Sequence, residues 1–120
     1  MSISIYGTSF DAADAAAIAA FWGEALGRAV NPGATRQSAS LAAREGTDEA
    51  PIMFHGVPEP KTVKNRLHLD LRPRDQTTEV ARLEALGARR VDVGQGEVSW
   101  VVLADPDGNE FCVLKPLSAS

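Results

Sequence analysis

The feature that most constrains how this chain can fold is a short internal repeat at half its length. The segment EALGRAV begins at Glu24 and the segment EALGARRV begins at Glu84, an offset of 60 in a chain of 120 residues. Each copy closes a stretch that reads as a strand followed by a helix, and each precedes several short strands. A shared order of elements at a fixed offset indicates a duplicated unit. We therefore expect a single domain, residues 1–120, built from two βαβββ modules at about 1–60 and 61–120.

Two helices are predicted at corresponding places in the two halves. In the first half, Asp11 or Asp14 can cap a helix through its carboxylate, and Gly27 can end it. In the second half, Asp75 is the expected cap and Gly87 the expected end. In both segments apolar residues recur at helical spacing, which predicts one buried stripe per helix. The stripe residues are Ile18, Phe21, Trp22, Ala25 and Leu26 in the first helix, and Val80, Leu83 and Leu86 in the second.

Most of the remaining sequence reads as short strands between turns. Leu67, Leu69 and Leu71 alternate with polar residues, which is the period of a half-buried strand. The segment DPDG, residues 105–108, has the residue preferences of a type I turn. The predicted strands span residues 3–10, 38–43, 52–57, 67–71, 90–93, 100–104 and 110–114. These elements predict an α+β fold, in which a curved mixed sheet surrounds a cup and the helices lie outside.

Composition narrows the classes of partner. The formal net charge is −4, which argues against nucleic-acid or anionic-membrane binding, because both need a basic surface. Cys112 is the only cysteine, so an intramolecular disulfide is excluded, as suits a reducing compartment. The first residues, MSISIYG, lack the basic segment of a secretory signal, and the alanine-rich stretch 12–20 is too short to span a bilayer. We therefore expect a cytoplasmic protein with no nucleic-acid partner and no membrane partner.

The second half carries a cluster of polar residues on one predicted sheet face. If the three leucines of residues 67–71 pack on the second helix, the alternate residues point into the cup. Clustered polar groups on an inner face cost free energy unless they hydrogen-bond, bind a ligand or coordinate a metal. The residues predicted to face the cup are His68, Asp70, Arg72, Glu110, Cys112 and Leu114, with Trp100 as a further candidate.

Each of these residues has a structural and a functional interpretation. His68 can hydrogen-bond Asp70 for structural reasons, or it can act with the Glu110 carboxylate as a general base, since imidazole titrates near neutral pH. Cys112 can be a small buried residue or a ligand contact. Trp100 can belong to the core or offer a flat face to a planar ligand.

Three segments together resemble the vicinal oxygen chelate superfamily, which includes glyoxalase I, extradiol dioxygenases, and fosfomycin- and bleomycin-resistance proteins. They are the helix end that contains FW at 21–22 and ALG at 25–27, the strand RLHLDL at 66–71, and DPDGNEF at 105–111. The stretch 57–75 is similar to a glyoxalase-like branch of bacterial proteins. The resemblance covers nearly the whole chain. It implies a small-molecule ligand in the cup and a homodimer.

The resemblance also bears on metal binding. Members that bind metal usually take ligands from the first and last strands of each half, commonly His or Gln, then Glu, His and Glu. In this sequence His68 matches the second-half histidine, and Cys112 stands where the final glutamate is expected. The first-half position falls on Gly7 or Thr8, which are not usual ligands. Glu110 lies two residues before the final position, so a divalent metal at His68 and Glu110 and a metal-free pocket both remain open.

The expected function is that of a small-molecule binding protein or a metal-independent enzyme of the glyoxalase/bleomycin-resistance type. The alternative is a divalent-metal-dependent lyase, isomerase or dioxygenase that uses His68 and Glu110. His55 enters as a candidate because it lies near the remaining first-half ligand position. The catalytic candidates are His68 and Glu110, and the ligand-binding candidates are His55, Asp70, Arg72, Trp100 and Cys112.

Overall fold

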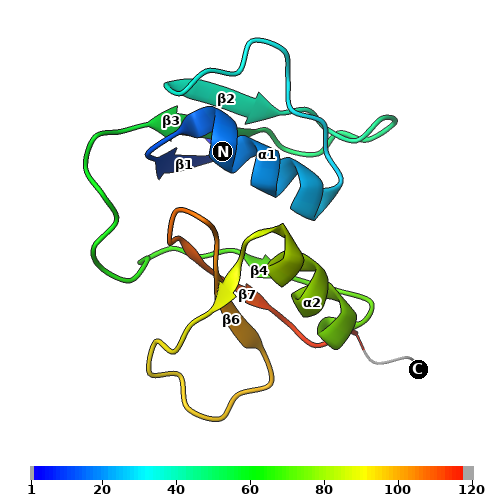
Figure 1. Ribbon diagram of the computed structural model, residues 1–120. Coiled ribbons are helices and arrows are strands. Elements are labelled where there is room, and N and C mark those ends of the chain that lie inside the picture. Colours follow the sequence, from blue (N-terminus) through cyan, green and yellow to red (C-terminus); the bar gives the residue numbers. More distant parts are fainter. Residues whose placement is uncertain (1, 118–120) are drawn as a thin grey trace. The chain divides into compact units, whose positions relative to one another are not determined.

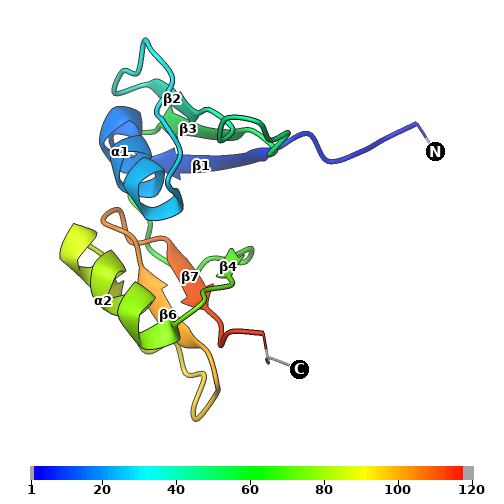
Figure 2. The ribbon, with the colours of Figure 1, turned by 90° about the vertical axis from the view of Figure 1, so that its right-hand side faces the viewer.

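The computed structural model describes residues 2–117 and divides the chain into two compact units, which meet between Pro60 and Lys61 (Figure 1). Each unit holds one sheet and one helix, and Figures 1 and 2 show each helix on one side of its own sheet. Each sheet contains one parallel pair and at least one antiparallel pair. The predicted α+β class is therefore confirmed, and the predicted cup shared by both modules stays a prediction. None of the helices in residues 2–117 is both long and apolar enough to cross a membrane.

The first unit has a three-stranded sheet in the order β1-β3-β2. Strands β1 and β3 are parallel, whereas β2 and β3 are antiparallel. The order in this unit is βαββ, one strand fewer than the predicted βαβββ module, and an isolated bridge joins Val30 to Leu41 after the helix. The elements are β1 (Thr8–Ala12), α1 (Ala15–Leu26), β2 (Ser38–Leu41) and β3 (Ile52–Gly56).

Helix α1 begins and ends where the sequence predicts. Of the two candidate caps, Asp14 is the one used, and its carboxylate accepts a hydrogen bond from the Ala17 N–H at 3.1 Å. Gly27 ends the helix with φ of 67°, a conformation that glycine adopts without steric cost. Trp22 on the buried stripe packs against Phe10 of β1, with ring centroids 5.3 Å apart. The helix is thereby fixed to the sheet.

The first strand lies further along the chain than predicted. The prediction of a strand over residues 3–10 is wrong in its first part, because pairing starts at Thr8, opposite Ile52. Before Ile52 stands Pro51, which has no N–H to extend the ladder. Ile3 and Ile5 are consequently about nine-tenths exposed, and Figure 2 shows residues 2–7 running beyond the end of β1.

The second unit has the predicted βαβββ order in a four-stranded sheet, β4-β7-β6-β5. Strands β4 and β7 are parallel, and the other neighbours are antiparallel. Asp75 caps the helix by accepting from the Thr78 N–H at 3.0 Å, and the predicted turn at 105–108 is closed by the Gly108 N–H to the Asp105 carbonyl. The elements are β4 (Asp70–Leu71), α2 (Gln76–Leu86), β5 (Arg89–Arg90), β6 (Val101–Ala104) and β7 (Glu110–Val113).

Two strands of this unit are shorter than predicted. Leu67 is 86% exposed, so its predicted place against the second helix is wrong, and the β4–β7 ladder starts only at the Leu69 carbonyl. The strand predicted over residues 90–93 ends early, because the Val93 N–H donates to the Gln95 side chain and not to β6. Because these strands are short, the segment before β4 and the segment after β5 are free to line a pocket.

Candidate functional site

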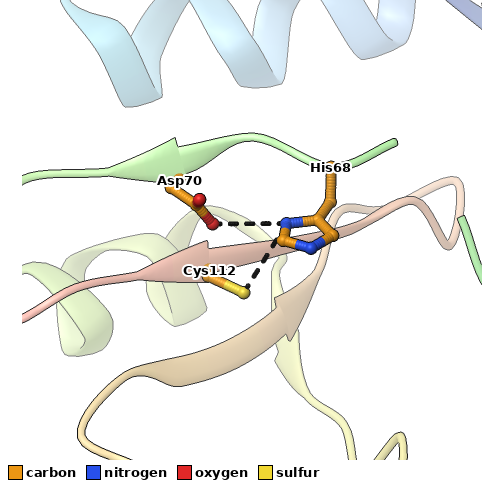
Figure 3. Close-up of side chains that lie close together, drawn as sticks. All are labelled: His68, Asp70 and Cys112. Atoms are coloured by element: carbon orange, nitrogen blue, oxygen red, sulfur yellow. Dashed lines mark hydrogen bonds and ion pairs between the residues drawn. The ribbon is translucent and has the colours of Figure 1, made fainter. Parts of the chain in front are cut away.

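The β4–β7 register brings three of the predicted site residues together. Asp70 and Cys112 are direct partners in this parallel pair, so their side chains leave the sheet on the same face. His68 lies two residues before Asp70 on the same segment. Its Nδ1 atom is 3.2 Å from the Asp70 carboxylate and 3.9 Å from the Cys112 sulfur. Figure 3 shows the three side chains converging on one point above the sheet.

The environment of this cluster holds Cys112 in its protonated form at neutral pH. Burial raises the pKa of the Cys112 thiol, and the negative charge of Asp70 raises that pKa further. A reactive thiolate needs a cationic neighbour, and Lys64 lowers this pKa by less than burial and Asp70 raise it. Without an added cation, Cys112 is therefore a weak nucleophile. His68, by contrast, can donate its Nδ1 proton to the Asp70 carboxylate, which orients the ring and leaves Nε2 to accept a proton.

A pocket of about 370 Å³ opens beside this cluster within the second unit. Five residues that the sequence predicted for the site line it, namely His68, Asp70, Trp100, Glu110 and Cys112. The segment between β5 and β6 supplies Trp100, whose side chain remains 39% exposed, together with Gln95. Val102 and Leu114 add apolar surface. The pocket thus joins a hydrophobic wall to a small polar cluster, which is the usual character of a small-molecule site.

Glu110 has partners that the sequence did not predict. Its carboxylate accepts a hydrogen bond from the Lys61 ammonium at 2.9 Å and another from the Asn65 N–H at 2.8 Å. Burial alone raises the pKa of Glu110, but these hydrogen bonds outweigh it and the pKa is lowered overall. Glu110 is therefore an ionised anchor that fastens the segment 61–65 to β7. No periodicity marks Lys61 or Asn65, and only the contact itself reveals them.

Two predicted site residues lie outside the pocket. Arg72 donates to the Lys115 carbonyl at the end of the chain segment that follows β7. His55 lies on β3 in the first unit, where it lines a separate pocket of about 350 Å³ with Ser38 and Met53. Within the second unit, Arg72 is therefore not part of the cluster around His68, whereas His55 belongs to the other unit and stays a prediction.

Backbone hydrogen bonds show which residue of the first unit corresponds to which residue of the second, and they do so more reliably than the offset of the sequence repeat. The Val57 N–H donates to the Ala12 carbonyl, and in the second unit the Leu114 N–H donates to the Leu71 carbonyl at the matching place. Val57 thus corresponds to Leu114, so His55, two residues earlier, corresponds to Cys112. Ala12 corresponds to Leu71, so Ser9, three residues earlier, corresponds to His68. The offsets are thus 57 and 59, not 60, so the earlier alignment of His68 with Gly7 or Thr8 is off by one residue or more.

Comparison with protein families gives a match over nearly the whole chain. Residues 7–114 match the family model described as a glyoxalase-like domain. The comparison with curated proteins gave no match.

Solved structures with the same fold cover almost all of the chain. A glyoxalase/bleomycin resistance protein/dioxygenase family enzyme from Burkholderia phytofirmans is 18% identical, with a TM-score of 0.68 over 95% of this chain and 100% of that one. A mutant of a fosfomycin resistance protein from Listeria monocytogenes, complexed with Mn(II) and a dihydroxypropylphosphonic acid, is 14% identical, with a TM-score of 0.68 over 98% and 93%. A bleomycin-binding protein from Streptomyces verticillus, complexed with copper(II)-bleomycin, is 16% identical, with a TM-score of 0.62 over 98% and 100%. At these identities the likeness concerns the fold.

Proposed function

The chain belongs to the glyoxalase-like domain family, and from that premise we propose that it binds a small organic molecule in the pocket beside His68 and Trp100. The observation that carries this proposal is the convergence of five sequence-predicted residues on one pocket of the second unit. Its volume, about 370 Å³, lies in the range of about 300–1,000 Å³ that is typical of small-molecule sites. The Listeria and Streptomyces proteins, which share the fold, are each described with a bound small molecule.

The lining of the pocket favours a planar ligand with at least one hydrogen-bonding group. The Trp100 indole offers a flat apolar face, while His68 and Asp70 offer a proton donor and an acceptor. Lys64 adds a cation at the rim. A ring that stacks on Trp100 can therefore direct a polar substituent toward His68.

A metal-independent enzyme is the second candidate, and the His68–Asp70 contact favours it. A carboxylate 3.2 Å from Nδ1 fixes the imidazole so that Nε2 can remove a proton from a bound substrate. In this version His68 is the catalytic base. Glu110 then acts through its ion pair with Lys61, by holding the pocket wall, because its carboxylate is already engaged.

The predicted homodimer and the cytoplasmic location remain proposals that rest on the family and on composition. Size-exclusion chromatography with light scattering distinguishes a particle of about twice the chain mass of 12.7 kDa from a single chain. A single-chain mass at all concentrations up to the millimolar range would contradict the dimer.

Tryptophan fluorescence tests the binding proposal directly. The chain has two tryptophans, and Trp22 is buried in the first unit, so a ligand in the pocket should quench Trp100. We expect saturable quenching by some member of a panel of planar aromatic compounds that includes bleomycin, with loss of at least about tenfold in affinity in Trp100→Ala, the equivalent of about 1.4 kcal/mol. Binding in Trp100→Ala is measured by calorimetry, because that variant lacks the reporter.

A matched control distinguishes binding in the pocket from non-specific binding to exposed aromatic residues. Tyr6 is another exposed aromatic residue, 74% accessible, and it does not line the pocket. Tyr6→Ala should bind as the wild type does. Equal losses in Tyr6→Ala and Trp100→Ala, or quenching that never saturates, would contradict the proposal.

A further inference from the structure

The three atoms that face one another at the His68 cluster are an imidazole nitrogen, a carboxylate oxygen and a sulfur. These are the atoms that zinc accepts as ligands in proteins. From this geometry we propose that His68, Asp70 and Cys112 form a binding site for a divalent cation of the zinc type. The site lies wholly within the second unit (Figure 3).

The distances between the three atoms suit a tetrahedral ion. Zinc bonds of about 2.0 Å to nitrogen and oxygen and about 2.3 Å to sulfur place ligand N and O about 3.3 Å apart, and N and S about 3.6 Å apart. The corresponding distances here are 3.2 Å from Nδ1 to the Asp70 oxygen and 3.9 Å from Nδ1 to the Cys112 sulfur. All three ligand atoms lie within 4.8 Å of one another. The oxygen-to-sulfur distance, bounded only by 4.8 Å, must approach about 3.6 Å, so closing the site around an ion takes a side-chain movement of up to about 1 Å.

The chemistry of the donor set selects among cations. A thiolate favours zinc and similar ions over magnesium or calcium, which prefer oxygen ligands. Deprotonated Cys112 and ionised Asp70 together carry two negative charges, which balance a divalent cation. Binding of the ion by the thiolate releases the thiol proton, so the affinity rises with pH.

Accessibility leaves one position of the ion open. The His68 and Asp70 side chains are 38% and 51% exposed, whereas Cys112 is buried. Three protein ligands with an open fourth position are typical of zinc sites that bind a further molecule. Here the open side faces the pocket that Trp100 lines, so a ligand there could contact the ion directly.

This ligand set differs from the one that the superfamily resemblance implies. That resemblance pairs His68 with a glutamate of the last strand at the position that Cys112 occupies here, and Glu110, two residues earlier, is the nearest glutamate. Glu110 is held by Lys61 and by the Asn65 N–H, and it is not among the residues that cluster around His68. Asp70 and Cys112 take its place, and both come from the same unit as His68.

Cobalt titration tests the site without any organic ligand, so its outcome is independent of the proposed function. Protein purified without an affinity tag and dialysed against a chelator is titrated with Co²⁺, which reports thiolate coordination through a charge-transfer band in the near ultraviolet. We expect one ion per chain, displacement by Zn²⁺, and no displacement by Mg²⁺. Absence of a thiolate band at saturating Co²⁺ would overturn the proposal.

Variants assign the ligands. His68→Ala, Asp70→Asn and Cys112→Ser should each weaken Zn²⁺ binding by at least about tenfold. That is the lower end of the loss in metal affinity when a residue that only hydrogen-bonds a metal ligand is removed. Glu97→Gln removes an exposed carboxylate of the same unit that belongs neither to the cluster nor to the pocket lining, and it should leave Zn²⁺ binding unchanged. Loss of binding in Glu110→Gln with binding intact in Asp70→Asn would overturn the proposal in favour of the His68–Glu110 pair.

Alkylation of the wild-type protein keeps the test valid should a variant fail to fold. Cys112 is the only cysteine, so the rate of its reaction with a small alkylating reagent reports on this site alone. We expect Zn²⁺ to slow alkylation at least about tenfold at saturation, because a coordinated sulfur is a poorer nucleophile, and Mg²⁺ to leave the rate unchanged. An alkylation rate that Zn²⁺ does not change would count against coordination by Cys112.

Discussion

At the scale of single residues, the partners of each side chain decide its role more than its type does. Glu110 and Asp70 are both carboxylates that line the same pocket as His68, yet Glu110 is bound to Lys61 and Asn65 while Asp70 faces the imidazole. Arg28 makes the same point in the first unit. It is 7% exposed and donates to the carbonyls of Ala42 and Ala50, so this charged residue serves to tie two loop segments together.

A residue-scale prediction concerns the ion pair that closes the loop before β3. The Arg44 guanidinium and backbone N–H hydrogen-bond to Glu49 and lower the pKa of that carboxyl to about 2. Because the pKa is depressed, the stabilisation is present above the ordinary pKa of 4.5 and is lost as pH falls from there toward about 2. The side chains lie at the surface, so the effect on stability is small, and the pKa itself is the better readout.

Carboxyl NMR titration checks this directly. Arg44→Ala removes the guanidinium but keeps the backbone N–H of residue 44, so it should raise the Glu49 midpoint from about 2 part of the way toward 4.5. Thr47→Val removes only the hydroxyl contact with Glu49, at 3.1 Å, and the hydroxyl contact with the Arg44 carbonyl, and it should raise the midpoint less. A wild-type midpoint near 4.5 would show that the pair does not form in solution.

At the scale of elements, helix ends were predictable from the sequence and strand ends were not. An aspartate before an apolar stripe and a glycine after it are local signals, and Asp14, Gly27, Asp75 and Gly87 act as expected. Strand ends depend on the neighbouring strand. β1 starts late because of Pro51 on the partner side, and β4 starts late because the segment before it is fastened to Glu110 by Asn65.

The first element-scale prediction concerns the cap of α1. Asp14→Ala removes the acceptor for the Ala17 N–H and should destabilise the protein by about 1 kcal/mol, the typical cost of a lost cap. Asp14→Asn keeps a capping oxygen but loses the ion pair with Arg36, which is 3.1 Å away, and should cost only a few tenths of a kcal/mol. Urea unfolding measures both, and equal losses would show that the cap contributes nothing.

The second element-scale prediction concerns the end of β3. A Cβ atom on Gly56 would lie 2.1 Å from the backbone carbonyl oxygen of Arg36, and the backbone there is held by the Gly56 N–H to the Gln37 carbonyl. Gly56→Ala should therefore destabilise the protein by about 1–3 kcal/mol, as overpacking does. Thermal unfolding measures this. A melting temperature equal to that of the wild type would mean that the loop at 36–37 shifts without cost.

At the scale of the whole molecule, the chain divides into two compact units between residues 60 and 61, and the sequence repeat has an offset of 60. It could not give the correspondence of individual residues. The helices differ by one residue in length, 12 against 11, and the hydrogen-bonded alignment shifts from 59 at β1 to 57 at β3. The sequence did identify half of the residues that line the second-unit pocket, because alternation along the segments 67–71 and 110–114 is a local signal. It could not identify Lys61 and Asn65, which reach Glu110 across 49 and 45 residues.

The central claim is that the second unit carries the ligand site. Amide chemical-shift mapping tests it most directly, with isotope-labelled protein titrated by a planar compound that quenches Trp100. The claim predicts saturable shifts concentrated in residues 64–70, 93–102 and 110–114, which line the pocket. Shifts confined to the first unit, around His55 and its neighbours on β2 and β3, would contradict it.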